Sequence, residues 1–562
     1  MPAVKVLTGL RLMLLATALC GAPWFAQAAE PGTTETDAAL ADAAPTDAAL
    51  PDEATLLAAG ARIGTITIDT RQIFNLDDPR ENKALYRLAN NLHAHTHDSV
   101  IRAQLLFKSG DLYSGRVLQE TERNLRTLRF LREPRVRATR YHDGVVDIEV
   151  VTHDVWTLQV GPTFGRSGGT NNSSFSFADQ NFLGLGKTLI LGAERNVDRT
   201  ASIVEWRDPS INGSRWEDNL YFSNTSDGHV RRVSVWRPFY SLSARHAFGV
   251  MLSDSALQDT RYVLGDSFDS YRRKSRGFDL YTGWSAGLQA GLTRRLTLGW
   301  RNAQDDFQLL PETRGPLPAD RKLSYPYLRA DWIRDAFRTT RDLELIDRTE
   351  DVHLGLSGST TLGMATRTGG SDRDAVLMDL NSQYGTLLGT SQQLYLDATW
   401  GTRIEGGHST DQRYSFSAAW YWRHSLRLQT HAKITTMGGS RLDLDHYYSL
   451  GGDNWLRGYP LRYQLGSGLT HVKIEERFYS GYSLWRLFDV GAAAFVDAGR
   501  VHGGNPLGAP NLGWLKDAGL GLRLGNSRSS LGAVIHVDLA TPLEQPAGVR
   551  SLQWLVSTKK TF

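Results

Sequence analysis

Between residue 158 and the end of the chain, apolar and polar side chains alternate along one stretch after another, and polar, glycine-rich segments separate the stretches. At 394–403 one side carries Leu394, Leu396, Ala398 and Trp400, whereas the other carries Tyr395, Asp397, Thr399 and Arg403. The pattern recurs at 278–284, 296–300 and 414–423. Alternation over about ten residues with an apolar outer face is typical of a transmembrane β-strand. Because lipid tolerates no open sheet edge, we predict a mainly β protein with an antiparallel β-barrel of about 16 strands over 158–562.

The composition suits a barrel better than a series of soluble domains. The chain has 15 Trp, 20 Tyr and 20 Phe, and several predicted strands end in Trp or Tyr, as in the aromatic girdle at a membrane interface. No stretch beyond residue 30 approaches the roughly 18 consecutive apolar residues of a membrane-spanning helix. A formal net charge of +3 with 22% charged residues favours neither anionic nor cationic partners.

Residues 1–28 indicate a secretory signal peptide. Two basic residues precede a short apolar run at 12–19, and Ala26-Gln27-Ala28 fits a small-x-small cleavage site. The alternative is a lipoprotein acylated at Cys20, but Leu19 is bulkier than the residue expected before such a cysteine. Cys20 is the single cysteine, so we expect neither a disulfide nor thiol chemistry in the mature chain.

Two segments separate the predicted signal peptide from the barrel. Residues 29–60 are rich in Ala, Thr, Pro and acidic residues and contain no Lys or Arg, so we predict a disordered linker. Residues 61–157 indicate a compact α+β domain. Its predicted elements are a strand at 63–70, a helix at 79–92, a short strand or turn at 100–107, a helix that begins near Ser114, and strands at 135–141 and 145–152.

This order of elements resembles a POTRA module. The resemblance also involves the string Phe107-Lys-Ser-Gly-Asp111 and the later Leu118, Glu122, Leu125 and Leu128. It implies a periplasmic domain that binds extended polypeptide by adding it to the edge of a sheet. The alternative is a spacer that orients the barrel, since an open sheet edge invites pairing but does not prove it.

Three strings in the barrel resemble the motifs of one superfamily. They are Leu450-Gly-Gly-Asp-Asn-Trp-Leu-Arg-Gly-Tyr-Pro460, Phe495-Val-Asp-Ala-Gly-Arg500 and Asp179-Gln-Asn-Phe-Leu-Gly-Leu-Gly186. Together with a POTRA-like domain and a terminal aromatic residue, they are similar to the BamA/TamA-type outer membrane protein assembly superfamily (the bacterial surface antigen family), to which two-partner-secretion transporters are related. The resemblance covers nearly the whole mature chain.

The resemblance implies a functional site inside the barrel. Arg457, Gly458 and Tyr459 would form the tip of a long loop that folds into the lumen. Alternation on the strand of the second string places Phe495, Asp497 and Gly499 toward the lumen. A buried carboxylate needs a charge-assisted partner, and the resemblance implies a bidentate pair between Arg457 and Asp497. Gly458 would let the backbone turn tightly beside the wall.

The other motif residues have separate expected places. The resemblance puts Asp179, Asn181, Gly184 and Gly186 in the first hairpin of the barrel. It also pairs Glu475 with Arg477 on the strand before Asp497. If these two face the lumen, Glu476 faces lipid, so either Glu476 lies near the interface or the strand is bulged there.

The last strand, at 551–562, carries the expected insertion signal. Trp554 lies in an alternating run, and Phe562 is the terminal aromatic residue by which such barrels are recognised for insertion. Lys559 and Lys560 are unusual so close to this end, and we expect their long side chains to reach the interface.

Two other patterns suggest enzymatic or metal chemistry. Gly265-Asp-Ser-Phe268 and Asp443-x-x-His446 resemble blocks of GDSL esterases but lack the strand–turn–helix context of that chemistry. His93, His95 and His97 lack the spacing of a closed metal site, so a solvated loop is the preferred interpretation. We therefore expect no enzymatic activity, no cofactor and no metal.

A basic run crosses the small domain. It comprises Arg123, Arg126, Arg129, Arg132, Arg135, Arg137 and Arg140. A solvated helix face with strand ends is the plain interpretation, and contact with anionic lipid or an acidic partner is the alternative.

The expected function is assistance to protein insertion or translocation at the outer membrane of a Gram-negative bacterium, with the small domain in the periplasm. Expected partners are outer membrane lipids, an unfolded or extended substrate polypeptide and a possible periplasmic or inner-membrane protein; nucleic acid is not expected. The alternatives are a dedicated two-partner-type secretion pore and a passive channel or surface antigen.

Overall fold

The computed structural model describes residues 50–530, 532–546 and 548–559. The predicted signal peptide, most of the predicted linker and Phe562 lie outside the described residues. Residues from Pro51 onward belong to one compact unit. Among the helices of the described residues, none is long and apolar enough to cross a membrane.

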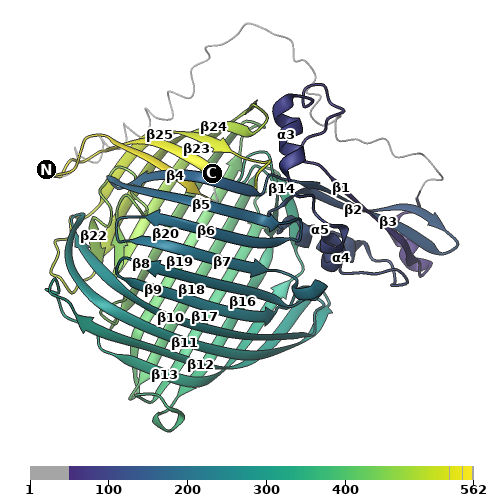
Figure 1. Cartoon of the computed structure of the whole chain (residues 1–562). Helices are drawn as coiled ribbons and strands as arrows, with labels where there is room; N and C mark the ends of the chain where they lie inside the picture. The colour runs from purple at the N-terminus through teal and green to yellow at the C-terminus, as the bar shows by residue number, and fades with distance from the viewer. Residues whose placement is uncertain (1–49, 531, 547, 560–562) are drawn as a thin grey trace, which may run out of the picture. The chain divides into compact units, whose positions relative to one another are not determined.

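The main body is a closed barrel, which contains 20 strands among the described residues (Figure 1). The strands are β4 (Leu158–Ser167), β5 (Thr170–Phe182), β6 (Lys187–Arg195), β7 (Thr200–Asp208), β8 (Glu217–Thr225), β9 (Gly228–Arg237), β10 (His246–Val263), β11 (Asp266–Gln289), β12 (Leu292–Leu309), β13 (Arg321–Arg334), β16 (Gly355–Ala365), β17 (Ala375–Leu387), β18 (Gln392–Glu405), β19 (His408–Arg423), β20 (Leu428–Ser440), β23 (Gly468–Leu484), β24 (Phe488–His502), β25 (Leu515–Gly525), β26 (Val534–Pro542) and β27 (Gln553–Lys559). Neighbouring strands pair antiparallel, and β27 meets β4 to close the barrel.

The prediction of a closed antiparallel barrel is confirmed, whereas the expected count of about 16 strands is wrong. The difference arises early in the barrel. β4–β9 have only 9 to 13 residues each and short turns at most of their ends, so they use far less chain per strand than the expectation allowed. The later β10, β11 and β12 have 18, 24 and 18 residues.

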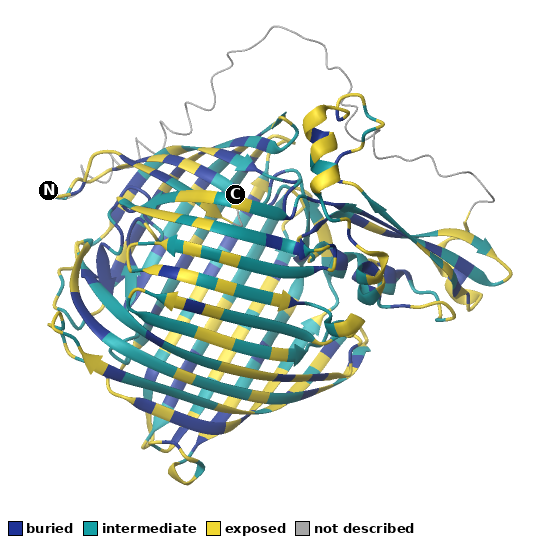
Figure 2. Cartoon of the chain, viewed as in Figure 1, coloured by how far each residue is buried: buried dark blue, intermediate teal, exposed yellow. Residues whose placement is uncertain are grey.

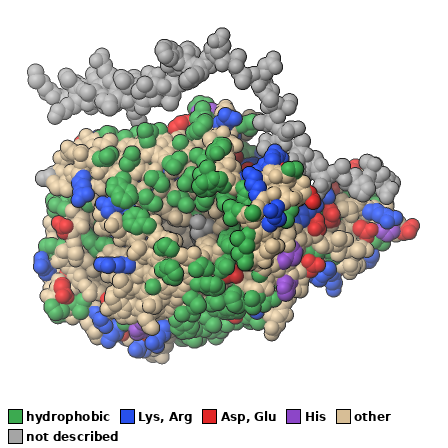
Figure 3. All heavy atoms as spheres, turned by 45° about the horizontal axis from the view of Figure 1, so that its top comes forward, with side chains coloured by type: hydrophobic (Ala, Val, Ile, Leu, Met, Phe, Trp, Pro, Cys, Tyr) green, Lys and Arg blue, Asp and Glu red, His purple; other side chains and the backbone are tan. Residues whose placement is uncertain are grey.

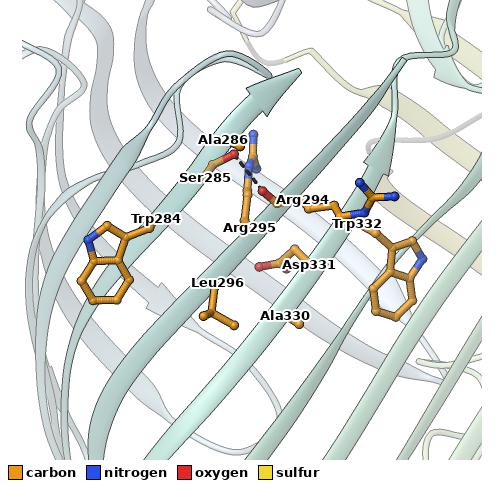
Figure 4. Close-up of a pocket in the computed structure, with 9 residues that line it drawn as sticks. All are labelled: Trp284, Ser285, Ala286, Arg294, Arg295, Leu296, Ala330, Asp331 and Trp332. Atoms are coloured by element: carbon orange, nitrogen blue, oxygen red, sulfur yellow. Dashed lines mark hydrogen bonds between the residues drawn. The ribbon is translucent and has the colours of Figure 1, made fainter. Parts of the chain in front are cut away.

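The outer surface of the barrel is an apolar belt. Leu296, Leu298 and Trp300 of β12 are exposed, as the alternation predicts, and exposed and buried positions alternate along most strands (Figure 2). Trp284 and Trp332 lie on either side of a shallow pocket on this surface, near the ends of β11 and β13 (Figure 4). An apolar belt edged by tryptophan is what a barrel needs to span a bilayer.

A small α+β domain precedes the barrel. Its elements are α2 (Glu53–Ala58), β1 (Arg62–Arg71), α3 (Ala84–Leu92), α4 (Asp98–Gln104), α5 (Gly115–Arg126), β2 (Leu131–His142) and β3 (Val145–Asp154). The sheet order is β1-β3-β2, with β1 parallel and β2 antiparallel to β3. Ile101, Leu125 and Ile148 are among the side chains buried in its core.

Besides the helix predicted at 79–92, which begins only at Ala84 as α3, two segments of this domain differ from the prediction. Residues 53–58, placed in the linker, form α2, because Asp52 caps the helix and Leu56 packs into the domain core. Residues 98–104, which overlap the short strand or turn expected at 100–107, form α4. Ile101 and Leu105 are buried four residues apart, which is the period of a helix rather than of a strand.

The barrel has two unlike ends. At the domain end, where β4 begins, the connection between β13 and β16 contains a hairpin of β14 (Phe337–Arg341) and β15 (Thr349–His353). At the opposite, loop end, residues 441–467 connect β20 to β23 and contain β21 (Tyr448–Leu450) paired with β22 (Gln464–Gly466). We call residues 337–353 the domain-end hairpin and residues 441–467 the lumen loop. Short 3-10 turns, η2 (Ile211–Gly213) and η3 (Arg367–Gly369), complete the structure.

Candidate functional site

The lumen loop folds back against the inner wall of the barrel. Leu450, Leu456 and Tyr459 of the loop are fully buried, and they pack with Leu469, Val501 and Leu515 of the barrel strands. The loop therefore has its own apolar anchor, and its tip is held in a fixed place rather than hanging in the channel.

Arg457 at the tip of the loop binds the wall of the barrel. Its Nε donates to Asp497 Oδ2 at 2.7 Å and its Nη2 to Asp497 Oδ1 at 3.0 Å, which makes the pair bidentate. Its Nη1 donates to Glu475 Oε2 at 3.1 Å. The guanidinium lies over the Phe495 ring, with Cζ 3.2 Å from the ring centroid. The loop tip and the strand predicted to receive it are thus in direct contact.

Glu475 is the centre of a buried charge network. Besides Arg457, it contacts Arg477 at 3.0 Å, Lys473 at 3.3 Å and Arg523 at 3.5 Å. Arg523 in turn binds Asp538 on β26. Burying charges costs several kcal/mol for each ion, so the network depends on every partner being present. The sequence reasoning missed Lys473, Arg523 and Asp538, although their lumen-facing parity on alternating strands was a usable signal.

Three motif residues fit the loop to the wall. A Cβ added at Gly458 would lie 2.6 Å from the Asp517 Cβ, and one added at Gly499 would lie 2.9 Å from the Leu450 side chain. Tyr459 Oη donates to the carbonyl oxygens of Lys516 and Glu544, each at 3.2 Å. Gly458 is not among the positive-φ residues, so its role is close approach rather than the tight turn expected.

The register of β23 shows how Glu476 lies between the lumen-facing Glu475 and Arg477. Glu476 pairs in register with Thr430, two residues into β20, and the ladder is continuous there. It accepts a hydrogen bond from Thr430 Oγ1 at 2.6 Å and lies 3.9 Å from His424 in the adjoining turn. Glu475 and Arg477 face the lumen without a bulge, and Glu476, in the middle of β23, lies level with the domain end of β20.

The lumen loop touches strands on both sides of the place where the barrel closes. On one side it contacts β23, β24 and β25 through Arg457 and Tyr459. On the other, Leu461 N donates to Gly168 O in the β4–β5 turn, and Arg462 binds Asp198 in the β6–β7 turn at 2.7 and 2.8 Å. The loop therefore bridges β23–β25, near the end of the chain, and the β4–β5 and β6–β7 turns, near the start of the barrel.

The contact between β27 and β4 is itself short. Among the described residues, only Val556 and Arg166 are paired across this seam, whereas β4 pairs with β5 over its full length. Side chains add to it: Trp554 stacks on Phe164 at 6.2 Å, and Arg166 lies 4.8 Å from the Trp554 ring centroid. Trp554 is thus at the seam, while Phe562 and Lys560 lie outside the described residues.

The motif expected in the first hairpin lies at the end of β5 and in the β5–β6 turn, at the other end of the barrel from Arg457. Asn181 is fully buried; its Nδ2 donates to Thr96 Oγ1 at 2.8 Å, and its Oδ1 accepts from Gly186 N at 2.7 Å. Asp179 Oδ1 accepts from Asn181 N. A Cβ at Gly184 would lie 2.1 Å from His95 O. These four residues join the barrel to the small domain.

The histidines of the small domain serve the same joint. His93 and His95 contact the buried Asp154 carboxylate at 2.9 and 3.2 Å, and Thr96 donates to it through its backbone N and Oγ1. His97 N donates to Gly184 O. The predicted solvated loop is therefore partly a buried contact next to the first barrel strand.

The other acidic and histidine residues of interest lie at the loop end. Asp411, Asp443 and His446 form the one metal-compatible group found among the described residues. Asp443 accepts hydrogen bonds from Arg321 and Arg403, and His446 contacts Asp411 at 2.9 Å. The carboxylate of Asp443, which belongs to the block that resembles an esterase motif, is thus already paired with arginine.

The domain-end hairpin reaches into the lumen toward the charge network. Leu343 O accepts from Arg477 Nη1 at 2.7 Å, and Asp342 O accepts from Tyr479 Oη at 2.9 Å. Tyr421 donates to Glu344. Burial raises the pKa of Glu350 to about 7, although the backbone N–H groups of residues 343–345 donate to its carboxylate and act in the opposite direction.

The same hairpin binds the small domain. Arg126 of α5 forms a bidentate pair with Asp351, with both distances 2.7 Å, and Arg123 lies over the Phe337 ring. Glu133 of β2 accepts from Thr349. Part of the basic run therefore contacts this hairpin, while Arg135 and Arg140 are exposed on β2. The sequence reasoning missed the hairpin, whose 341–351 segment is dense in charge and has no strand alternation.

Fold and site together define a class: a membrane β-barrel whose lumen holds a loop anchored through a buried arginine. The sequence matches no family model and no curated protein. Solved structures similar to it include BamA from Haemophilus ducreyi lacking POTRA domains 1–3 (14% identity, 88% of this chain and 84% of that chain, TM-score 0.36) and CdiB from Escherichia coli (14% identity, 88% and 76%, TM-score 0.44). CdiB from Acinetobacter baumannii is similar over 89% of this chain and 73% of that chain, with 14% identity and a TM-score of 0.41. Similarity at this level assigns no function to the chain.

Proposed function

We propose that this protein is an outer membrane barrel that assists the insertion or translocation of polypeptides, and that it works by opening the seam between β27 and β4. The observation that carries the proposal is the single registered pair across that seam among the described residues. A net backbone hydrogen bond contributes about 0.5–1.5 kcal/mol, so this is the least costly place to separate two strands. An opened seam presents two strand edges, to which an extended substrate can add.

The small domain would receive the substrate first. Its sheet has the order β1-β3-β2, so β2 lies at an edge of the sheet, which supports this role. Arg135 and Arg140 are exposed along β2. An extended segment could pair with this edge, and acidic side chains on it would be attracted to the arginines.

The contents of the lumen favour a gated barrel over a passive channel. The lumen loop occupies the wall beneath the loop end, and the domain-end hairpin reaches the same charge network from the other end. Passage through the barrel would require both segments to move. The loop contacts both sides of the seam, so its withdrawal and seam opening would be coupled.

A disulfide across the seam tests the proposal. In a Cys20→Ser background, Arg166→Cys with Val556→Cys should lock the one registered pair, stop function in the oxidised state and release it on reduction. The matched control is Thr163→Cys with Ser174→Cys, whose native hydroxyl oxygens are 2.6 Å apart across the stable β4–β5 pair. The seam proposal is wrong if both locks have the same effect.

Depletion followed by proteomics of the outer membrane separates the candidate roles. Loss of many barrels is expected for assembly. Loss of a single exported protein would instead indicate a two-partner-type secretion pore, and an unchanged proteome would contradict both.

A further inference from the structure

Helix α3 exposes a stripe of leucines. Leu85, Leu88 and Leu92 are 59%, 54% and 62% exposed, and their spacing puts them on one face of the helix. Tyr86, on another face, is 5% exposed. The helix is short, yet one of its faces exposes three large apolar side chains. An exposed apolar stripe of this kind indicates an interaction surface.

The helix is fixed against the rim of the barrel at the domain end. Tyr86 Oη donates to Trp485 O at 2.9 Å, and Tyr86 stacks on Phe74. Glu81, just before the helix, binds Arg486 of the β23–β24 turn at 2.7 Å and Arg528 of the β25–β26 turn at 2.6 Å. The leucine stripe therefore has a defined position beside these two turns, as Figure 1 shows for α3 and the β23–β24 turn.

The stripe borders an apolar groove of about 280 Å³, which we call the α3 groove. Across the groove from the leucines lie Leu487 and Phe488, and Trp156 also contributes to its wall. Phe488 is the first residue of β24 and has the same parity as the outward-facing Ala494 and Val496. The groove is thus continuous with the outer, lipid-facing surface of the barrel.

The groove also lies at the height expected for a membrane interface. Trp485 in the β23–β24 turn and Tyr482 near the end of β23 are 66% and 60% exposed. Trp and Tyr are enriched where a barrel meets the headgroup region. Lys83 is exposed just before α3, where it would reach lipid phosphates. Figure 3 shows hydrophobic side chains continuing over the barrel surface toward the small domain.

We propose that α3 is an interfacial membrane helix and that the α3 groove binds phospholipid of the leaflet at the domain end. The leucines would enter the acyl region beside Leu487 and Phe488, and Lys83 would lie near the phosphates. The small domain would thereby rest on the membrane next to β23–β26. The inference requires only that the barrel spans a bilayer, so it stands or falls separately from the proposed function.

Quenching by labelled lipid tests this directly. The full chain in a Cys20→Ser background is reconstituted into vesicles of phosphatidylethanolamine and phosphatidylglycerol, with a fluorophore on Leu88→Cys or, as control, on Arg87→Cys. The two positions are adjacent in sequence, but only Leu88 lies in the stripe. Doxyl-labelled phospholipid should quench the Leu88 probe at least threefold more strongly. Equal quenching overturns the proposal. A probe that is blue-shifted but unquenched also overturns it and indicates a polypeptide in the groove.

A second variant tests whether the stripe itself holds the helix in the membrane. Leu85→Gln with Leu92→Gln leaves the Leu88→Cys probe in place. Quenching should then fall to the level of the Arg87→Cys control, while the barrel keeps its heat-modifiable migration on gels. Quenching that persists at the original level in this folded variant would contradict the proposal.

Discussion

The guanidinium of Arg457 is buried, and contacts with protein atoms replace almost all of the water that would otherwise solvate it. Both oxygens of Asp497, one oxygen of Glu475 and the face of Phe495 surround it. Such a pair gains little over an apolar isostere, but removal of one member leaves an uncompensated buried charge. Arg457 therefore serves mainly to fix one position of the lumen loop, and not to raise overall stability.

Arg457→Ala should destabilise the folded barrel by about 3–5 kcal/mol, because Asp497 and Glu475 lose their buried partner. Denaturant unfolding in detergent measures the change. Adding Asp497→Asn should recover part of the loss, since it removes the unpaired charge.

The control for this experiment is Lys516→Ala, whose partner Glu544 is exposed and lies 3.5 Å away. A pair of this kind contributes about 0–1 kcal/mol. Arg457→Ala with the stability and function of the unaltered protein would refute the anchoring role of the loop tip.

At the scale of elements, the domain-end hairpin is the unexpected feature. It is a connection between two barrel strands, yet it reaches Arg477 in the lumen and Arg126 in the small domain. Residues 342–346 are placed by partners on β19, β20 and β23 rather than by their own pattern. The hairpin is thus a physical connection between the small domain and the charge network of the loop.

The docking of this hairpin should weaken as the pH rises from about 4.5 to about 7. The pKa of Glu350 rises from its ordinary 4.5 to about 7 in the folded protein, so the folded state keeps a proton that the unfolded state releases in this window. The free energy of unfolding is therefore greatest below about pH 4.5, falls between about pH 4.5 and about pH 7, and no longer changes with this group above that range. Glu350→Gln keeps the acceptor Oε1 but cannot ionise.

Unfolding midpoints at pH 5 and pH 8 measure the effect. The unaltered protein should lose more stability between these values than Glu350→Gln does. Glu312→Gln, at an exposed loop-end position, should behave like the unaltered protein. Identical pH dependence in all three proteins would contradict the assignment.

The elements that could be predicted are those whose burial follows a local period. The barrel, β2, β3 and the lumen-facing parity of Asp497 all follow from alternation. α4 was not predicted, since so short a helix shows its period only through one pair of buried residues, Ile101 and Leu105. Lys473, Arg523 and Asp538 meet around Glu475 because of the register between the successive strands β23–β26, which the alternation within a single strand does not encode.

On the scale of the whole molecule, the barrel and the small domain meet through a compact joint. Asp154, the last residue of β3, is buried under His93, His95 and Thr96, and Thr96 also binds Asn181 of the barrel. Further contacts join α5 to the domain-end hairpin and Glu81 to two barrel turns. Three separate contacts of this kind restrain rotation of the domain.

Gly184→Ala should loosen this joint. The added Cβ would lie 2.1 Å from His95 O, and the residue has a φ of 74°. Gly169→Ala is the matched control, because Gly169 has a φ of 83° and no atom within 4 Å of an added Cβ. The control should cost only the roughly 1–2 kcal/mol of a left-handed residue with a side chain.

Limited proteolysis at residues 154–158 measures the joint. Cleavage should be several-fold faster in Gly184→Ala than in Gly169→Ala, and both barrels should remain folded. Equal cleavage rates would mean that the first-hairpin motif does not hold the domain.

The lumen loop has a kinetic consequence. The β27–β4 seam offers little resistance of its own among the described residues, so the activation barrier for opening is set mainly by extraction of Arg457 and Arg462 from their carboxylates. The lifetime of the closed barrel is then adjustable through the loop alone, without any change to the two strands that separate.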